Sequence, residues 1–398
     1  MIASHADANS KTQIRIAYVV NRFDVGGLER YISRMCSNLP RSQFPAEIIC
    51  LRTAGSASKW IDPQLTTVHE LGASRGNDRR TMKKLADLVQ NRGIRIVQSH
   101  NWGTLLETYF ARKQFPKQIR HVHAERGTVL GPDCNTRIRK LIRSLAMRWV
   151  LPRVSGVICN AYAIDEKIRE LTGLTRLPIE IIPNGIVQPS LDLDTSRMQL
   201  RRELGISDNA FVIGFLGRLA PVKNPGLLLE AFYLLNKSAH LSGQPTDELK
   251  LLVVGDGVLK GELEQKVDEL KLQRSVIFAG EQTDSLRWLS GMDVMVNSSL
   301  SEGMSQSILE AMSLGIPTIV TDVGDSRRMI GGMDLAESCG LWVESQDVRG
   351  MATKLQQLWS HPELRCQLSQ SAKERFASEY SIQRMLQRHQ DYYAKLTL

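Results

Sequence analysis

Residues 293–312 read DVMVNSSLSEGMSQSILEAM. The opening residues form a short apolar run, which predicts a buried strand at 293–299. Ile308, Leu309 and Met312 then share one face of a helix, and a turn that contains a glycine separates this helix from the strand. A strand that leads through a turn into a helix is the repeating unit of a parallel α/β sheet.

This stretch also carries two carboxylates. Glu302 and Glu310 are eight residues apart, and eight residues of helix span about 12 Å. That length matches the reach from the sugar of a nucleotide sugar, across its two phosphates, to the ribose. We expect Glu302 to accept hydrogen bonds from sugar hydroxyls and Glu310 to accept them from the ribose. The alternative is a packed helix with Ser301 as N-cap and Glu302 favouring the helix dipole.

The start of the predicted helix offers a place for a phosphate. Backbone N–H groups at a helix N-terminus are unpaired and carry partial positive charge. Gly303 lets an anion approach the backbone, and we expect Met304 and Ser305 to supply the N–H donors.

The same alternation of strands and helices extends along the chain in both directions. The predicted strands lie at residues 14–20, 47–51, 94–100, 119–125, 156–160, 179–186, 211–219, 249–257, 276–280, 293–299 and 317–322. The predicted helices begin at Leu28 and after Gly303, or span residues 81–90, 103–112, 137–150, 165–171, 226–235, 261–270 and 285–290. This alternation predicts parallel, doubly wound sheets.

The length of 398 residues suits two such domains. The stretch VQPSLDLDTS (residues 187–196) reads as a linker, so residues 1–186 and 187–380 are predicted to form separate domains. Ligands of doubly wound sheets bind outside the carboxyl ends of the strands. With two domains, the expected site is the cleft between them.

Composition excludes several classes of protein. None of the six cysteines forms a CxxC pair or a metal-ligand cluster, so neither a disulfide framework nor a zinc site is expected, and no cofactor is predicted. Reduced thiols indicate a cytoplasmic protein. Residues 1–13 lack the apolar core of a signal peptide, and no apolar run is long enough to predict a membrane-spanning helix.

The net charge of +9 is unevenly distributed. Residues 1–190 hold 29 Lys and Arg against 15 Asp and Glu, whereas residues 191–398 hold 22 against 27. A basic domain can face nucleic acid, anionic lipid or a phosphate-bearing substrate, or it can be a solvated surface. No basic motif interleaved with aromatic residues is present, so nucleic acid is not an expected partner.

Two cations follow the first strand of the second half. In FLGRLAPVKN (residues 215–224) the strand ends near Gly217, which places Arg218 and Lys223 on the loop over its carboxyl end. Two cations at this position can neutralise a diphosphate. Elsewhere on a surface the same two residues would be ordinary solvated charges.

Nearly the whole chain resembles the retaining GT-B glycosyltransferases of family 4. The spacing from Glu302 to Glu310 is similar to the EX7E signature of that family. Other segments that resemble it, in the same order along the chain, are GGLER (26–30), IPNGI (182–186), GRLAPVKN (217–224), VVGDG (253–257) and VTDVGD (320–325).

The resemblance implies a GT-B fold of two Rossmann-like domains with an interdomain cleft, the donor on the C-terminal domain and the acceptor on the N-terminal one. It implies that Arg218 and Lys223 hold the diphosphate of a nucleotide sugar, with UDP favoured. It further implies that Gly27 faces the phosphates and that no metal is bound. The family's last helix often returns to the N-terminal domain, as residues 381–398 are expected to do.

One position departs from the family pattern. Family members commonly place a histidine after the strand that corresponds to IRHVHAERG (119–127), and the alignment puts Arg126 there. An arginine cannot act as a general base at neutral pH, but it can hold the donor sugar or a phosphate electrostatically. His123 remains a second candidate, although a lone histidine in a strand is more often structural.

The implied reaction is sugar transfer with retention of the anomeric configuration, in which the leaving phosphate oxygen helps to deprotonate the acceptor. A glycan or lipid-diphosphate-linked acceptor of a cell-surface polysaccharide pathway would explain the basic first half. The basic helix at 137–153 could then attach the protein peripherally to the anionic inner face of a membrane. The alternative is an amphipathic helix packed on the sheet.

Other functions fit less well. An epimerase of the same architecture would lack the Glu302 and Glu310 pair, and a phosphorylase would be much longer. A non-catalytic sugar-nucleotide-binding subunit would be expected to lose Lys223 or Glu302, and neither is lost. A dinucleotide oxidoreductase would need GxGxxG after the first strand, whereas NRFDVGG (21–27) has only two adjacent glycines.

Overall fold

A computed structural model describes the chain in two compact units. The residues outside the described part are 1–12, 75–77, 128–135 and 333–337. These ranges include Cys134 and most of residues 1–13, the segment that lacks a signal-peptide pattern. The first unit comprises Met1–Pro183 and Met385–Leu398, and the second comprises Asn184–Arg384.

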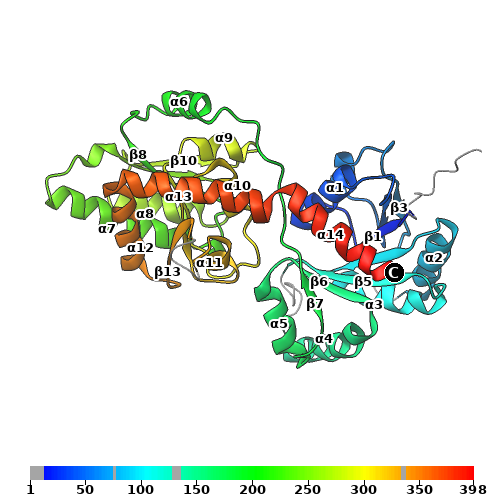
Figure 1. The fold of residues 1–398 in the computed structure, drawn as a ribbon. Coiled ribbons are helices and arrows are strands. Elements are labelled where there is room, and N and C mark those ends of the chain that lie inside the picture. The colour runs from blue at the N-terminus through cyan, green and yellow to red at the C-terminus, as the bar shows by residue number, and fades with distance from the viewer. Residues whose placement is uncertain (1–12, 75–77, 128–135, 333–337) are drawn as a thin grey trace, which may run out of the picture. The chain divides into compact units, whose positions relative to one another are not determined.

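The first unit is built on a parallel sheet of seven strands in the order β3-β2-β1-β4-β5-β6-β7 (Figure 1). Its strands are β1 (Ile16–Val20), β2 (Ala46–Cys50), β3 (Val68–Glu70), β4 (Ile96–His100), β5 (Arg120–Glu125), β6 (Gly156–Cys159) and β7 (Ile179–Ile181). Its helices are α1 (Gly27–Asn38), α2 (Arg79–Asn91), α3 (Trp102–Ala111), α4 (Arg137–Val150), α5 (Tyr162–Thr172) and most of α14 (Ile382–Thr397). The strand order reverses between β1 and β4, so a ligand of this sheet is expected outside the carboxyl ends of these two strands.

Helices cover both faces of this sheet, which is why its central strands are fully buried. Val19 of β1 packs in one core with Leu85 of α2 and Ala111 of α3. The neighbouring residue, Tyr18, points to the opposite face. There α14 covers the sheet, with the hydroxyl of Tyr393 3.5 Å from that of Tyr18.

The second unit contains a parallel sheet of six strands in the order β10-β9-β8-β11-β12-β13. Its strands are β8 (Phe211–Leu216), β9 (Leu249–Val254), β10 (Val276–Gly280), β11 (Val294–Asn297), β12 (Thr318–Thr321) and β13 (Gly340–Val343). Its helices include α6 (Leu193–Glu203), α7 (Pro225–Leu241), α8 (Lys260–Glu269), α9 (Ser285–Ser290), α10 (Gln306–Leu314), α11 (Ser326–Met329), α12 (Val348–Ser360) and α13 (Pro362–Arg375). The order reverses between β8 and β11, so a ligand of this sheet is expected outside the carboxyl ends of these two strands.

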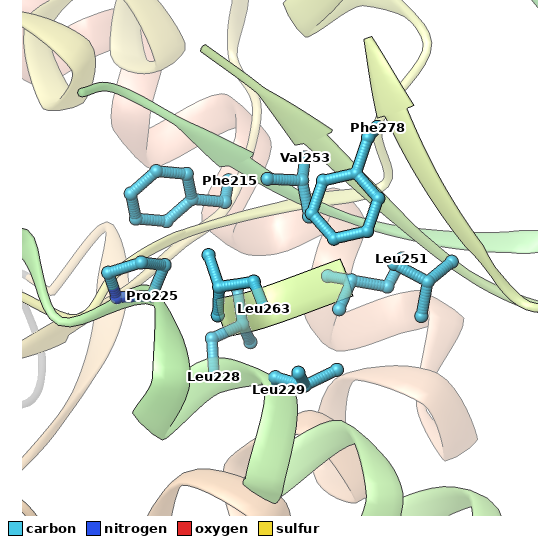
Figure 2. Close-up of a pocket in the computed structure, with 9 residues that line it drawn as sticks. Phe215, Pro225, Leu228, Leu229, Leu251, Val253, Leu263 and Phe278 are labelled. Carbon is cyan, nitrogen blue, oxygen red and sulfur yellow. The ribbon is translucent and has the colours of Figure 1, made fainter. Parts of the chain in front are cut away.

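The second sheet also has a core on each face. Phe215 of β8 packs with Leu228 of α7, whereas Val212 of the same strand packs with Leu289 of α9. Figure 2 shows the first of these cores around a cavity of about 10 Å³, which is at the limit of what one water molecule needs. Apolar side chains line this cavity, so it belongs to the core and offers no polar group to a ligand.

The predicted linker at residues 187–196 is wrong in its second half. The side chain of Asp192 accepts a hydrogen bond from the N–H of Thr195 and caps α6. Asp and Ser are preferred helix caps, which is the reason that this stretch read as a linker. Arg201 of α6 is buried and its guanidinium contacts Asp293 at 2.7 Å, which fastens the helix to the start of β11.

The sequence pattern also missed β3 and β13. Both are edge strands, and β3 has only three residues, none of them buried. β3 (Val-His-Glu) lacks the apolar run on which the strand predictions rested, whereas the four residues of β13 (Gly-Leu-Trp-Val) form a run too short to stand out. All of the predicted strands are present: β10 has the predicted bounds, β2 is shifted by one residue, and the rest are shorter than predicted.

Candidate active site

The loop after β8 is fixed by the loop after β9. The N–H of Gly217 donates to the carbonyl oxygen of Val254 at 3.0 Å. Gly255 has a φ of 135°, and a Cβ there would lie 1.9 Å from the oxygen of Gly217, so only glycine permits this approach. Arg218 is exposed on this fixed loop, and its side chain makes no hydrogen bond or ion pair with another residue that the structure describes.

Lys223, farther along the same loop, forms an ion pair with Glu302 in the turn after β11. Ser299 Oγ and Asn297 Nδ2 also donate to Glu302, at 2.8 and 3.3 Å. All three contacts end on Oε1, and the Glu302 side chain is only 9% exposed. The structure therefore brings together two residues that the sequence analysis treated separately, and it leaves Oε2 of Glu302 outside these contacts.

The helix of the opening stretch starts later than the sequence predicts. α10 begins at Gln306 with Ser305 as its N-cap, so Ser301 is not the cap and Glu302 lies in the preceding turn. Only residues 306–310 of the interval are helical, and they rise about 6 Å. The expectation of 12 Å of continuous helix between the two glutamates is therefore wrong.

Hydrogen bonds across the turn explain the later start. Asn297 Nδ2 donates to Ser305 Oγ at 3.0 Å, and the N–H of Asp325 donates to the carbonyl oxygen of Gly303 at 3.2 Å. These bonds keep the turn before Ser305 in a non-helical conformation, so α10 starts at Gln306. The four unpaired N–H groups of α10 then start at Ser305, whereas Met304 precedes them.

Both glutamates have further local contacts. Gly324 has a φ of 56°, and a Cβ there would lie 2.0 Å from the backbone oxygen of Glu302. The turn that carries Glu302 is thus packed directly against the loop after β12. Glu310 accepts a hydrogen bond from Gln306 Nε2 at 3.1 Å and remains partly exposed along α10.

In the first unit, Gly27 opens α1 after the loop that leaves β1. It is exposed, and no atom lies within 4 Å of the place that a Cβ would occupy. Gly27 therefore stands at the open N-terminus of α1, which follows the carboxyl end of β1.

His123 lies inside the first unit, with no exposed surface. Its Nδ1 is 2.9 Å from Ser99 Oγ, and its Nε2 is 3.5 Å from a carboxylate oxygen of Glu125. Burial raises the pKa of the Glu125 carboxyl. The structure thus places His123 in a buried polar group of the sheet, and its role in the reaction stays a prediction.

Arg126 follows β5 and is held from three sides. Its guanidinium carbon lies 3.3 Å from the centre of the Tyr31 ring, and its Nη2 lies 3.2 Å from Nε2 of His389. Its backbone N–H donates to Asn101 Oδ1 at 3.0 Å. Asn101, at the end of β4, has a φ of 54°, a conformation that a non-glycine residue keeps only when its surroundings require it.

Tyr31, Asn101 and His389 were missed by the sequence analysis. Tyr31 lies one helical turn after Gly27, which is a signal that local reasoning could have used. His389 lies 263 residues from Arg126 along the chain, so no local pattern connects the two.

The basic helix α4 presents an apolar surface. Its exposed apolar residues recur at helical intervals, and they are Ile138, Leu141, Ile142, Leu145 and Trp149. Six cations lie on the same segment, at Arg137, Arg139, Lys140, Arg143, Arg148 and Arg153. Among the described residues, no helix is both long enough and apolar enough to cross a membrane.

The described ranges contain no cluster of three or more His, Cys, Asp or Glu side chains that could hold a metal ion. The candidate residues instead form two groups. Lys223 and Glu302 meet beside the start of α10 in the second unit, with Arg218 on the same loop as Lys223, and Arg126 with Tyr31, Asn101 and His389 lies in the first.

Two family models match adjacent parts of the chain. Residues 25–187 match the model described as Glycosyltransferase Family 4, and residues 196–375 match the model described as Glycosyl transferases group 1. Together the two matches span most of both units.

Full-length relatives agree with these matches. The chain is 24% identical to the UDP-Gal:alpha-D-GlcNAc-diphosphoundecaprenol alpha-1,3-galactosyltransferase of Escherichia coli, over 98% of this chain and 99% of that protein. It is 28% identical to the putative glycosyltransferase EpsF of Bacillus subtilis (strain 168), over 84% and 88% of the two chains.

Solved structures show the same fold. Anabaena Alr3699/HepE in complex with UDP superposes with a TM-score of 0.78 at 17% identity, over 96% of this chain and all of that one. A glycosyltransferase from Rickettsia africae ESF-5 gives 0.78 at 17% identity, over 97% and 99%. The chain has the GT-B fold and belongs to glycosyltransferase family 4.

Proposed function

We propose that this glycosyltransferase moves a sugar from a nucleotide-diphosphate sugar, with UDP favoured, to a glycan or lipid-diphosphate-linked acceptor of a cell-surface polysaccharide. The relative from Escherichia coli is named for a UDP-sugar donor and a diphosphoundecaprenol acceptor, and Alr3699/HepE binds UDP, which supports this choice. The observation that carries the proposal is the ion pair of Lys223 with Glu302 beside the start of α10.

The diphosphate is proposed to bind Arg218, Lys223 and the unpaired N–H groups at the start of α10. Arg218 is exposed on a fixed loop, so its guanidinium is available to a phosphate without breaking another contact. The helix N-terminus adds partial positive charge without a metal. Gly27 is proposed to offer a second open backbone to the phosphates.

The two glutamates are proposed to hold the ends of the donor. Oε1 of Glu302 is occupied by three protein donors, which fixes the plane of the carboxylate and aims Oε2 at the sugar hydroxyls. Glu310 is proposed to accept hydrogen bonds from the ribose. Because the helix is shorter than expected, the turn from Glu302 to Ser305 supplies part of the separation.

The proposed reaction retains the anomeric configuration. The bond between the anomeric carbon and the diphosphate oxygen breaks, and the acceptor oxygen forms its bond to that carbon on the same face. The acceptor proton goes to the leaving oxygen, and the nucleoside diphosphate departs. Arg218, Lys223 and the α10 N-terminus stabilise the negative charge that develops on the diphosphate, and Arg126 holds a sugar or phosphate group.

The surface of α4 is proposed to dock on the anionic inner face of a membrane. An apolar stripe next to six cations matches a bilayer surface of negative charge, at about 1 kcal/mol per well-placed cation. This attachment would bring a cytoplasmic enzyme to a lipid-linked acceptor at the inner face of the membrane.

Sedimentation with vesicles tests this attachment. The wild type should bind phosphatidylglycerol vesicles more strongly than phosphatidylcholine vesicles, and Leu141→Glu with Ile142→Glu should abolish binding. Leu241→Glu in the second unit, also at an exposed leucine, is the matched control. Equal binding of the wild type to both lipids would contradict an anionic docking surface.

A screen of nucleotide sugars tests the enzymatic function. At least one should raise the melting temperature and be hydrolysed slowly without an acceptor, whereas an epimerase would convert the sugar without releasing it. Glu310→Ala should weaken nucleotide binding, and Glu302→Ala should mainly reduce turnover. The proposal is wrong if no nucleotide sugar stabilises the protein.

A further inference from the structure

A buried polar cluster lies between the first sheet and the helices α1 and α14. Its members come from five parts of the chain, and they are Tyr18, Tyr31, Gln98, His100, Arg126, His389 and Tyr393. All except Arg126 are almost fully buried. Buried polar groups are costly unless they are paired, so the pairing inside this cluster constrains each side chain.

The contacts of His389 define its tautomer. Its Nδ1 lies 2.8 Å from the carbonyl oxygen of Met385, which can only accept, so Nδ1 carries the proton. Nε2 is then an acceptor if the ring is neutral. Its single lone pair lies 2.8 Å from the hydroxyl oxygen of Tyr31 and 3.2 Å from Nη2 of Arg126, so these two donors share it.

The electrostatic surroundings keep this ring neutral. Burial, and after it the nearby charge of Arg126, lower the pKa of His389 to about 3. A protonated Nε2 would direct a donor at the guanidinium of Arg126, which has only donors. The neutral ring of His389 therefore offers Arg126 a lone pair, which the hydroxyl of Tyr31 shares.

The rest of the cluster is oriented in the same way. His100 Nδ1 lies 3.1 Å from the carbonyl oxygen of Val19, so its Nε2 accepts from Gln98 Nε2 at 3.0 Å. The hydroxyl of Tyr393 donates to Gln98 Oε1 at 2.7 Å. Tyr393 thus anchors α14 in the cluster without contributing to the contacts of Arg126 described above.

We propose that His389 is a positioning residue for Arg126, and that α14 supplies to the first sheet the acceptor that aims this guanidinium at the substrates. The inference rests on the proposed role of Arg126 in the function above. Tyr31 fixes the face of the guanidinium, Asn101 fixes its backbone, and His389 fixes its edge. A cation held in this way needs no reordering when charge develops, which is the condition for electrostatic catalysis.

Three variants test the inference. His389→Phe keeps a ring but removes the acceptor, and kcat should fall about 10- to 100-fold with little change in donor KM. His389→Gln can return an acceptor near the position of Nε2, and kcat should recover to within about threefold of the wild type. Tyr393→Phe, a matched loss of a buried hydroxyl on the same helix, should leave kcat within about twofold.

Nitrogen NMR of the histidine ring gives a readout that does not depend on activity. His389 Nε2 should be unprotonated at neutral pH in the wild type, and in Arg126→Gln its signal should shift. A protonated Nε2 in the wild type would overturn the inference, and this measurement decides the matter even if His389→Phe fails to fold.

The outcomes separate this inference from the proposed function. If the wild type neither binds nucleotides nor transfers sugar, the proposed function fails, whereas the tautomer of His389 still tests the contact with Arg126. If the wild type transfers sugar and folded His389→Phe retains its kcat, only the positioning role fails. Equal losses of kcat in His389→Phe and Tyr393→Phe would show a structural cluster and would also overturn the inference.

Discussion

The two units hold their candidate cations differently. In the second unit Arg218 is exposed and Lys223 is paired with the carboxylate of Glu302. In the first unit Arg126 is held by the ring of Tyr31, the neutral His389 and the backbone contact to Asn101. The carboxylate of Glu302 offsets the charge of Lys223, whereas the contacts with Tyr31, His389 and Asn101 orient Arg126. The side chain of Arg218 can thus turn toward a ligand, and that of Arg126 is held in one orientation.

Replacement of Lys223 should have the largest effect. Lys223→Ala removes a proposed diphosphate ligand and leaves Glu302 without its cation, so kcat/KM should fall about 10²- to 10³-fold. Steady-state kinetics with the best donor measure this loss. Lys266→Ala breaks another lysine–glutamate pair of the same unit, with Glu230, and should leave activity within about twofold. An equal loss in both variants would show that the pair of Lys223 with Glu302 has no special role in the reaction.

Arg126→Lys should have the next largest effect. A lysine keeps the charge but loses the planar stack on Tyr31, so kcat should fall about 10- to 100-fold while the nucleotide still raises the melting temperature. Arg112→Lys, at a guanidinium over the ring of Tyr109, is the control in the same unit. Wild-type kcat in Arg126→Lys would mean that orientation of this charge is irrelevant.

Gly324→Ala should reveal how rigidly the second unit holds Glu302. The new Cβ would meet the backbone oxygen of Glu302, so kcat should fall about tenfold and the free energy of unfolding by about 1–3 kcal/mol. Gly205→Ala has a similar positive φ of 64° but no atom within 4 Å of the new Cβ. Its unfolding free energy should fall by about 1 kcal/mol at unchanged kcat. Similar kcat values in the two variants would contradict the proposed support of Glu302.

The smallest effect per residue is expected from mild acid. Burial lowers the pKa of His100 and of His389 to about 3, and it also lowers the pKa of His121. In the unfolded chain these rings take up protons below a pKa of about 6.5, so protonation favours unfolding between about pH 6.5 and 3. From pH 7 to 5.5 the free energy of unfolding should fall by about 1 kcal/mol per histidine.

Urea unfolding at the two pH values measures this effect. The buried Glu125 acts in the opposite direction, because its raised pKa lets the folded state bind a proton first. The pH dependence should be weaker in His389→Gln. Stability that rises on acidification, or a wild-type slope in His389→Gln, would contradict a neutral His389.

Local sequence patterns predicted what local contacts determine. The strand before Glu302 and the helix after it follow from apolar spacing, and their order predicts the parallel sheet. The start of α10 could not be predicted, because Ser301 and Ser305 are both good caps and the choice depends on Asn297 and on the loop after β12. In the same way, the cap Asp192 resembled a linker residue until Arg201 showed that its helix is packed.

The environment of Arg126 depends on contacts that no local pattern contains. The sequence identified Arg126 by its place after a strand, at the position where a histidine was expected. Its partners come from the strand end of β4, from the first helix and from the last one. Only the folded chain brings these residues together, which is why they escaped the sequence analysis.

The distance along the chain between α14 and the first sheet also determines when their contacts can form during protein synthesis. Gln98 and Tyr393 are hydrogen-bonded partners 295 residues apart, so translation at 5–20 residues per second separates their appearance by about 15–60 s. During that interval the side chains of Tyr18, Tyr31 and Gln98 lack the contacts that α14 makes with them in the folded protein. His389, a partner of the Arg126 side chain, is therefore synthesised 263 residues after Arg126 itself, so the orientation of this guanidinium is completed long after its strand has been made.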